Sequence, residues 1–269
     1  MERKRWVIDP GQKIDLSTEP TRATDGAPGG KIETKAACDE LRAELSKLQD
    51  RLYAESRQAL LLVLQAMDAG GKDGAIKKVF GGVNPQSCRV TSFKYPSAAE
   101  LQHDFLWRIS KALPARGEVG IFNRSHYEDV GVARVKNLVP KGTIQERFKV
   151  INSFEDGLSV SGTRIVKIFL HISKGEQAKR LVARLENPHK RWKFRPADLE
   201  DRALWDDYMK AYGAAISATS TKASPWYVIP ADRKWYRDWS ILTILVETLK
   251  EMNPRYPDPI PDIENVKIV

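Results

Sequence analysis

Short, continuously apolar runs alternate along the chain with longer stretches in which apolar residues recur at a helical period. The run over 60–64 (LLLVL) precedes a glycine-containing loop, which is typical of a strand buried on both faces of a parallel sheet. Similar runs predict four more strands, over 89–93, 118–122, 164–170 and 226–229. The stretches between them predict helices over 31–56, 74–80, 97–112, 126–137, 143–158, 174–186, 198–217 and 234–251. This alternation predicts an α/β fold with a parallel sheet of about five strands, flanked by helices.

The two ends of the chain lack this alternation. Residues 1–30 are rich in Pro, Gly, Thr and Asp and show no periodicity, so we expect an irregular N-terminal arm. Residues 253–269 contain four prolines, which exclude a helix and predict an extended tail. We interpret residues 31–252 as a single domain.

Composition narrows the class of protein. There are 44 Lys and Arg against 35 Asp and Glu, and the net charge of +9 favours an anionic partner. No apolar run approaches the roughly 18–20 residues that span a bilayer, and the first residues contain no apolar stretch of signal-peptide length. The two cysteines, Cys38 and Cys88, lack the spacing of a metal site and are too few for a disulfide framework. We therefore expect a soluble, cytoplasmic enzyme.

The segment 65–74 (QAMDAGGKDG) lies directly after the first predicted strand and directly before a helix. It is similar to a P-loop in which Ala66 replaces the leading glycine and Asp73 replaces the usual Ser or Thr. Its glycines let backbone N–H groups face an anion, and the start of the helix adds its dipole. The residues that we expect to hold phosphate are Gly70, Gly71, Lys72, Asp73 and Gly74.

Two carboxylates in this loop are candidate metal ligands. Asp68 would repel a bare phosphate, so we interpret it as a Mg²⁺ ligand or as a group that orients an attacking oxygen, the alternative being a turn-forming aspartate. Asp73 can hold a hydrated Mg²⁺ with a carboxylate in place of a hydroxyl. We expect Mg²⁺ as cofactor, with Mn²⁺ as an alternative ion.

The third predicted strand ends in 121–129 (IFNRSHYED). In a P-loop fold, the strand beside the first one normally ends in a carboxylate that reaches Mg²⁺ through water, and Asn123 holds that place here. Arg124 follows it, in a position suited to neutralise charge in a transition state; the alternative is a surface salt bridge. Glu128 and Asp129 stand where acidic residues favour the start of a helix.

Basic residues are concentrated over 179–195, which holds seven Lys or Arg where composition predicts about three. The pair Asn187-Pro188 interrupts the predicted helix, so the segment 179–199 is similar to the hinged lid of nucleotide kinases; the alternative is a solvated basic helix. The cations that we expect to contact phosphate from this segment, or along a route for a long anion, are Arg180, Arg184, Lys190, Lys193, Lys77, Lys78 and Lys94.

Four motifs together carry a specific resemblance: DAGGKDG at 68–74, NRSHYED at 123–129, NPHKRWK at 187–193 and PWYVIPADRKWY at 225–236. In this order and spacing they resemble the polyphosphate kinase 2 family, from about residue 48 to 252. The resemblance implies a fold similar to thymidylate kinase and a homo-oligomer, tetramer or dimer. It also implies Mg²⁺-dependent, reversible phosphoryl transfer between inorganic polyphosphate and nucleotides, AMP to ADP and ADP to ATP.

The second motif departs from the sequence DRSWYN that most members restricted to one nucleotide class carry, and its NRSHYE resembles the third group of the family, class III. Because position 123 is not acidic, Asp68 and Asp73 are left as the metal-side carboxylates. The catalytic residues that the resemblance implies are Asp68, Lys72 and Arg124. The nucleotide-binding residues are Asn123, Arg124, Glu128, Asp232 and Lys234.

Two other functions are compatible with parts of this pattern. An ATP-dependent nucleoside monophosphate kinase shares the P-loop and the lid, but Asp68, the replaced Ser or Thr and the basic route speak against it. A basic nucleic-acid-binding module leaves Lys72 and its two carboxylates unexplained, and the sequence has no recognition-helix or stacking-sheet signature. We expect polyphosphate and adenine, or also guanine, nucleotides as partners, and neither nucleic acid nor a membrane.

Overall fold

The computed structural model describes residues 2–261 and 263. At its centre lies a six-stranded sheet in the order β1-β6-β5-β2-β4-β3. Its strands are β1 (Val7–Ile8), β2 (Ala59–Gln65), β3 (Cys88–Ser92), β4 (Val119–Asn123), β5 (Thr163–His171) and β6 (Trp226–Pro230). The five predicted strands are confirmed and run parallel, and β1 adds an antiparallel strand at the edge beside β6.

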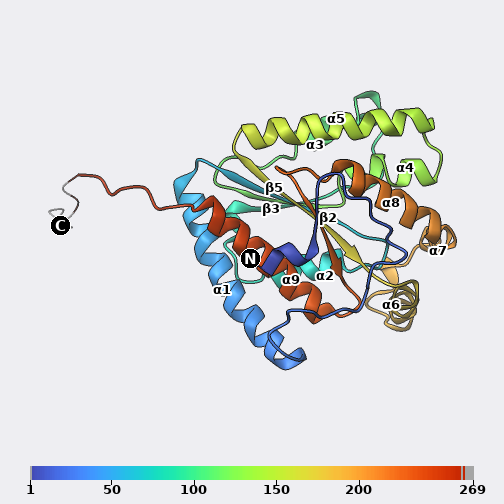
Figure 1. The fold of residues 1–269 in the computed structure, drawn as a ribbon, viewed down its shortest axis with the longest axis horizontal. Helices are drawn as coiled ribbons and strands as arrows, with labels where there is room; N and C mark the ends of the chain where they lie inside the picture. The colour runs from blue at the N-terminus through green and yellow to red at the C-terminus, as the bar shows by residue number, and fades with distance from the viewer. Residues whose placement is uncertain (1, 262, 264–269) are drawn as a thin grey trace.

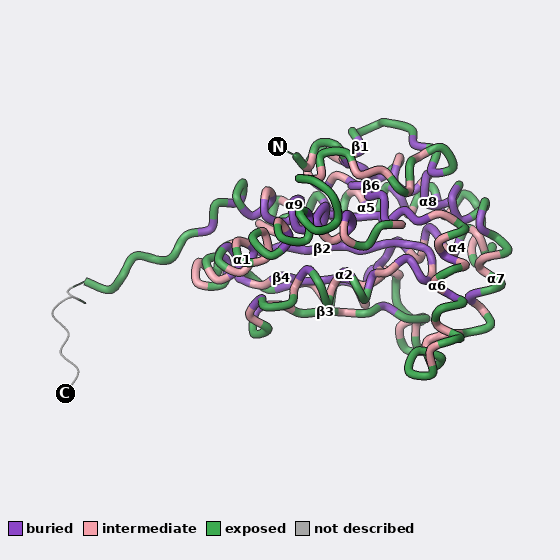
Figure 2. Tube along the Cα trace, turned by 90° about the horizontal axis from the view of Figure 1, so that it is seen from below, coloured by how far each residue is buried: buried purple, intermediate pink, exposed green. Residues whose placement is uncertain are grey.

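Helices cover both faces of the sheet (Figure 1). They are α1 (Lys31–Glu55), α2 (Lys72–Val79), α3 (Trp107–Ser110), α4 (Val132–Val135), α5 (Lys141–Val160), α6 (Lys174–Glu186), α7 (Ala197–Ala203), α8 (Trp205–Thr219) and α9 (Lys234–Met252). The helices α1, α2 and α9 lie on one face, and α5 and α8 lie on the other. Every residue of β2 is therefore buried (Figure 2), as its continuously apolar sequence requires.

Three of the predicted helices are interrupted. The stretch 97–112 contains a short 3-10 helix and α3, because the Asp104 side chain accepts a hydrogen bond from Leu106 N (2.9 Å) and starts a new turn. The stretch 126–137 contains the 3-10 helix η4 (His126–Asp129) and α4, which are separated at Gly131, a poor helix former. The stretch 198–217 divides into α7 and α8 at Leu204.

The N-terminal arm is more ordered than its composition predicts. It contains a 3-10 helix, Glu2–Trp6, before β1, and the Trp6 ring packs edge-on against Tyr236 and Trp239 of α9 (centroid distances 6.1 and 5.5 Å). A two-residue strand is too short to show a period, so the sequence pattern could not reveal it. At the other end, residues 255–261 extend away from the body and are exposed (Figure 1), while residues 264–269 of the predicted tail lie outside the described residues.

No helix in residues 2–261 and 263 combines the length and the apolar character that a membrane crossing requires.

Candidate active site

Two segments meet at the carboxyl edge of the sheet. The loop 66–71 joins β2 to α2, and the turn 124–128 follows β4. Because β2 and β4 are paired, with Leu64 opposite Asn123, the two segments leave the sheet side by side. Ligands of open α/β sheets bind at this edge, where successive connections run to opposite sides of a central strand.

The backbone of the loop leaves N–H groups of α2 facing outward. Gly71 caps α2 with φ of +100°, a left-handed conformation that suits glycine, and a β-carbon there would collide with the Arg237 guanidinium. Gly70 N donates to Met67 O (2.9 Å), which closes the loop on itself. The first hydrogen bond of α2 runs from Ala75 N to Gly71 O (2.9 Å), so the N–H groups of residues 72–74 precede it. Such a helix start is suited to bind an anion.

Lys72 is a buried cation at the start of α2. The residue is 8% exposed, and its Nζ donates to Ala66 O at 2.8 Å. Burial, together with the nearby Arg124 guanidinium, lowers the pKa of Lys72 to about 8. A bound phosphate would return the charge stabilisation that burial removes, so the lysine is poised to favour an anion.

An ion pair joins the loop to the turn. Arg124 Nη2 lies 2.6 Å from Asp68 Oδ1, and Nη1 lies 3.5 Å from Glu128 Oε2. Although burial acts to raise it, the Arg124 guanidinium holds the pKa of Asp68 below its ordinary value, so the pair is ionised. Arg124 adopts φ of +64°, a left-handed conformation that costs a non-glycine residue about 1–2 kcal/mol. Backbone strain of this kind is concentrated at functional sites.

Glu128 lies in a drier environment on the same turn. In the orientation of the Gln65 amide that satisfies both of its ends, Nε2 donates to Glu128 Oε1 at 2.9 Å and Oε1 accepts from Ser125 Oγ at 3.1 Å. Burial raises the pKa of Glu128, against the opposing effect of Arg124. The carboxylate therefore has a fixed position within reach of both Arg124 and the loop.

Asp73 contacts two other predicted site residues. Its two oxygens accept hydrogen bonds from Asn123 Nδ2 and Lys193 Nζ, both at 2.9 Å. The Asp73 side chain is 66% exposed, so it remains accessible to a ligand. This hydrogen bond from Lys193 joins the segment 179–199 to the start of α2.

The acidic side chains fit a metal that is shared with substrate. Among residues 2–261 and 263, no three His, Cys, Asp or Glu side chains gather closely enough to form an all-protein metal site. Mg²⁺, however, is commonly held by one or two carboxylates together with phosphate oxygens and water. Asp68 of the loop and Asp73 at the start of α2, which stand on either side of Lys72 in the sequence, provide such a pair of carboxylates.

Two residues that the sequence places at the phosphate or the nucleotide are hydrogen-bonded to other parts of the protein in this structure. The Arg180 guanidinium donates to the carbonyl oxygens of Ala69, Gly70, Ala231 and Asp232, at 2.7–3.2 Å. The Asp232 carboxylate accepts from Ser173 N and Oγ and from Thr21 Oγ1, at 2.8–3.1 Å. Both therefore hold the loop, α6 and the N-terminal arm to the end of β6.

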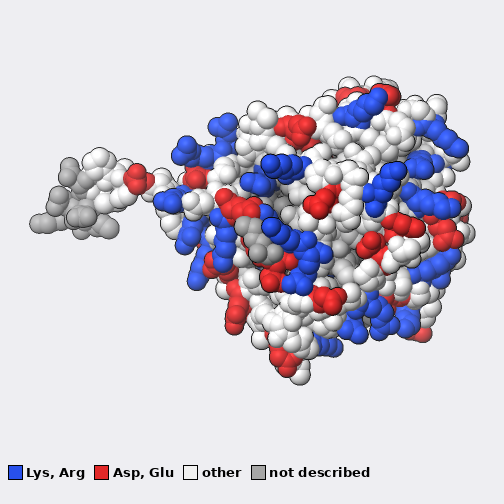
Figure 3. Space-filling view, viewed as in Figure 1, with Lys and Arg blue, Asp and Glu red and all other residues white. Residues whose placement is uncertain are grey.

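The remaining predicted cations lie around this centre. Arg184 Nη1 lies 3.4 Å from Asp198 Oδ2. Lys and Arg side chains gather over α6 in the face that Figure 3 presents. The residues of this predicted set that are exposed are Lys77, Lys78, Lys94, Lys190 and Lys234.

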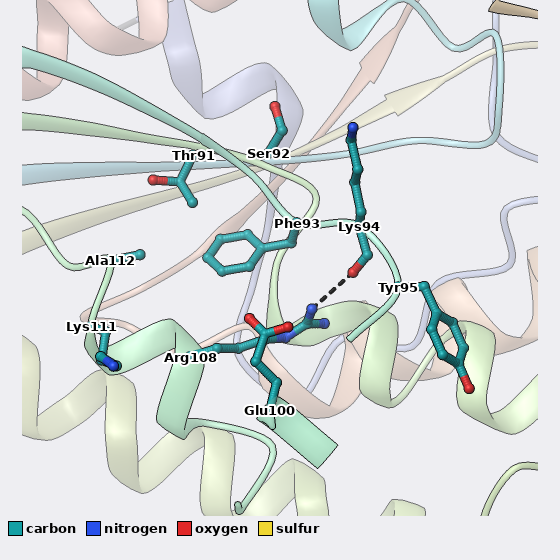
Figure 4. A pocket seen from close by; sticks show the side chains of 9 residues that line it. All are labelled: Thr91, Ser92, Phe93, Lys94, Tyr95, Glu100, Arg108, Lys111 and Ala112. Atoms are coloured by element: carbon teal, nitrogen blue, oxygen red, sulfur yellow. Dashed lines mark hydrogen bonds between the residues drawn. The ribbon is translucent and has the colours of Figure 1, made fainter. Parts of the chain in front are cut away.

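Lys94 lines a separate hollow of about 310 Å³ at the end of β3, together with Phe93, Tyr95, Arg108 and Lys111. Figure 4 shows that the Lys94 side chain points away from Arg108, which donates from Nη1 to Lys94 O at 2.8 Å. The Arg108 guanidinium lies 5.5 Å from the centre of the Phe93 ring. The hollow is thus lined by cations and aromatic rings next to the edge of the sheet that carries the site.

Sequence reasoning missed two residues whose side chains donate hydrogen bonds to backbone carbonyls of the loop. Arg237 is 2% exposed, and its Nη1 donates to Gly71 O (3.2 Å). Gln177 Nε2 donates to Asp68 O (3.1 Å). Both lie within helical patterns, and Arg237, next to Asp238 in α9, does not stand out from the other charged positions.

The comparison with known proteins agrees with this site. The sequence profile of the polyphosphate kinase 2 family matches residues 30–257, which include the loop, the turn and the segment 179–199. The chain belongs to the polyphosphate kinase 2 family. The resemblance that the four motifs carry is thereby confirmed.

Relatives within the polyphosphate kinase 2 family match over almost the whole chain. The sequence is 52% identical over 265 residues to the AMP/ADP-polyphosphate phosphotransferase of Meiothermus ruber, covering 98% of this chain and 99% of that protein. It is 45% identical to the ADP-polyphosphate phosphotransferase of Rhodopseudomonas palustris, covering 97% of this chain and 94% of that protein. The crystal structure of polyphosphate kinase 2 from Arthrobacter aurescens TC1 is similar with a TM-score of 0.91 and 41% identity, covering 97% and 95% of the two chains.

The contacts of Arg180 predict that it stabilises the loop. Arg180→Lys should lower the free energy of unfolding by about 1–3 kcal/mol, because one ammonium group cannot reach carbonyls on both the loop and β6. Arg184→Lys is the matched control. The Arg184 side chain that contacts Asp198 is partly exposed, so the free energy of unfolding should change by no more than about 0.5 kcal/mol. Denaturant unfolding measures both, and equal losses in the two variants would contradict this role for Arg180.

Proposed function

We propose that this chain transfers phosphoryl groups reversibly between inorganic polyphosphate and nucleotides, converting AMP to ADP and ADP to ATP. The observation that carries the proposal is the arrangement of Lys72 between Asp68 and Asp73, at a loop where ATP-dependent P-loop kinases place a hydroxyl residue. The relatives from Meiothermus ruber and Rhodopseudomonas palustris are named as polyphosphate phosphotransferases, which supports polyphosphate, rather than ATP, as the donor.

In the proposed reaction, a terminal phosphate oxygen of the nucleotide attacks the terminal phosphorus of polyphosphate. The bond to the next bridging oxygen breaks, and the polymer leaves one phosphate shorter. The N–H groups of residues 72–74 and the Lys72 ammonium hold the end of the polymer, and the Arg124 guanidinium neutralises charge on the transferred group. Since phosphoryl transfer leaves little covalent work to the protein, positioning and electrostatics dominate.

Asp68 and Asp73 would hold Mg²⁺, or Mn²⁺, against the phosphates. When bound, the ion would supply positive charge that stabilises the negative charge of the phosphates. The Asp68 carboxylate is already ionised by its contact with Arg124, and Asp73 is accessible beside Asn123, so neither needs to lose a proton before it acts.

We infer that the segment 179–199 acts as a lid. Lys193 already reaches the loop through Asp73, and Lys190 and Arg184 lie on the same segment. Closure over the phosphates would exclude water from the transfer. The exposed cations Lys77, Lys78 and Lys94 would follow the polymer outward, and Lys234 would face the nucleotide from the start of α9.

Product analysis tests the proposed function. With Mg²⁺, polyphosphate and AMP, the purified chain should form ADP and then ATP, and EDTA should stop the reaction. Lys72→Ala should lower turnover about 10²–10³-fold, since the loop then loses its buried cation, whereas Lys47→Ala on the exposed side of α1 should not change it. Transfer to AMP from ATP but not from polyphosphate would contradict the proposal.

Glu128 is the residue from which we expect acceptor choice to be tuned, as class III membership would imply. Glu128→Asn shortens the side chain by one methylene and removes a negative charge that Arg124 now faces. The ratio of kcat/KM for AMP to that for ADP should change about ten- to a hundredfold at saturating polyphosphate, with the fold intact. An unchanged ratio would leave Glu128 with the role of an acidic residue at a helix start.

A further inference from the structure

A buried charged cluster lies behind the turn 124–128, outside the phosphate and nucleotide contacts described above. Lys167 of β5 is fully buried, and all three of its donors are used. Its Nζ donates to Glu155 Oε2 of α5 at 2.5 Å, to Tyr127 Oη at 3.0 Å and to Thr219 O at the end of α8 at 2.6 Å. Four separate elements therefore meet at one ammonium group.

The second oxygen of Glu155 faces the turn. Tyr127 Oη donates to Glu155 Oε1 at 2.8 Å, and His126 Nε2 lies 3.3 Å from the same oxygen. Although burial acts in the opposite sense, the Lys167 ammonium holds the pKa of Glu155 below its ordinary value, so the pair is ionised. Tyr127 thus both accepts from the cation and donates to the carboxylate.

Stability alone gives no reason for this cluster. A buried ion pair is often no more stabilising than apolar side chains of similar volume, because both charges lose their hydration. The residues on the same face of β5 as Lys167, Ile165 and Phe169, are apolar and equally buried. Burial alone therefore does not explain a lysine at this position, and the role of the charged pair is to be found in what it holds.

The cluster adds a buried anchor to the end of the turn, where Gln65 of β2 also reaches Glu128. At the start of the turn, Arg124 N donates to Leu64 O of β2 (3.1 Å), with Arg124 in its left-handed conformation. Tyr127 lies three residues later and directly precedes Glu128. The turn is therefore held to β2 through Leu64 and Gln65, and Tyr127 ties it to the Glu155–Lys167 pair as well.

We propose that Tyr127, Glu155 and Lys167 are positioning residues of the transfer reaction, which fix the turn 124–128 so that Arg124 and Glu128 face the nucleotide. This inference rests on the proposed function. It predicts that the cluster affects the binding of the nucleotide and the transfer of phosphate to it. The loop 66–71, which we expect to hold polyphosphate, is anchored separately by Arg180, Arg237 and Gln177.

Tyr127→Phe tests the inference with the removal of one oxygen atom. The ring keeps its edge-on packing against Trp226 (centroid distance 4.7 Å), while the turn loses its link to the ion pair. We expect kcat/KM for the nucleotide to fall about tenfold or more, and the KM for polyphosphate to stay within about twofold. The control is Tyr236→Phe, a residue of the same low exposure, which loses a hydroxyl that donates to Asp25 O (2.8 Å).

The control should lower the Tm by a similar amount and leave both kinetic parameters unchanged. Nucleotide parameters that stay unchanged in Tyr127→Phe, or that fall together with those of polyphosphate, would overturn the inference. ADP binding by calorimetry gives a readout that needs no turnover: its Kd should rise about tenfold in Tyr127→Phe alone. If the wild type binds ADP but transfers no phosphate, the proposed function fails, and this Kd comparison still decides whether the cluster positions the turn.

A second variant removes the charges and keeps the acceptor. Glu155→Gln combined with Lys167→Met leaves no unpaired buried charge, and the amide oxygen introduced at position 155 can still accept from Tyr127 Oη. We expect its nucleotide kcat/KM to fall, but by less than in Tyr127→Phe, because the turn loses the bond from Lys167 and keeps the one to position 155. A nucleotide kcat/KM equal to that of the wild type would show that the charged pair does not position the turn, and a loss larger than in Tyr127→Phe would contradict a role through Tyr127.

Discussion

The ion pair between Asp68 and Arg124 is the interaction on which the arrangement of the site depends, because it joins the segments that follow two neighbouring strands. Parallel pairing of β2 and β4 brings these segments to the same edge, and the pair then sets their distance. Arg124 makes it from a left-handed backbone conformation that a non-glycine residue otherwise avoids. Hydrogen bonds from Arg124 N to β2 and from Tyr127 to Glu155 hold the turn and help to sustain this strain.

The net charge of +9 divides into two structural roles. Some cations, such as Arg180 and Arg237, bind carbonyl oxygens of the loop and are unavailable to an external anion. Because these side chains donate to carbonyl oxygens of the loop, the loop is held in one conformation. In it, the first N–H groups of α2 have no partner within the helix and can bind an anion. Other cations, such as Lys77 and Lys190, are exposed and remain available to a long anion. Charge count alone does not separate these roles.

The parts of the structure that depend on local sequence were predictable. The five parallel strands follow from short apolar runs, and the loop follows from glycines and a lysine at fixed spacing. The roles of Arg180 and Asp232 were not predictable, because their partners lie 51 to 211 residues away in sequence and are mostly backbone atoms. The Lys167 cluster left one visible sign, a lysine in the middle of an apolar strand, but only the packed structure supplies its partner Glu155.

A double-mutant cycle tests the central claim that Asp68 and Arg124 act as a pair in phosphoryl transfer. The phosphoryl transfer rate is measured in the wild type, in Asp68→Asn, in Arg124→Gln and in the double variant, each checked for an unchanged Tm. If the pair acts as a unit, the double variant should lose little more than the worse single variant, within about tenfold. Losses that multiply to the product of the two single effects would show that the residues act independently and would contradict the account.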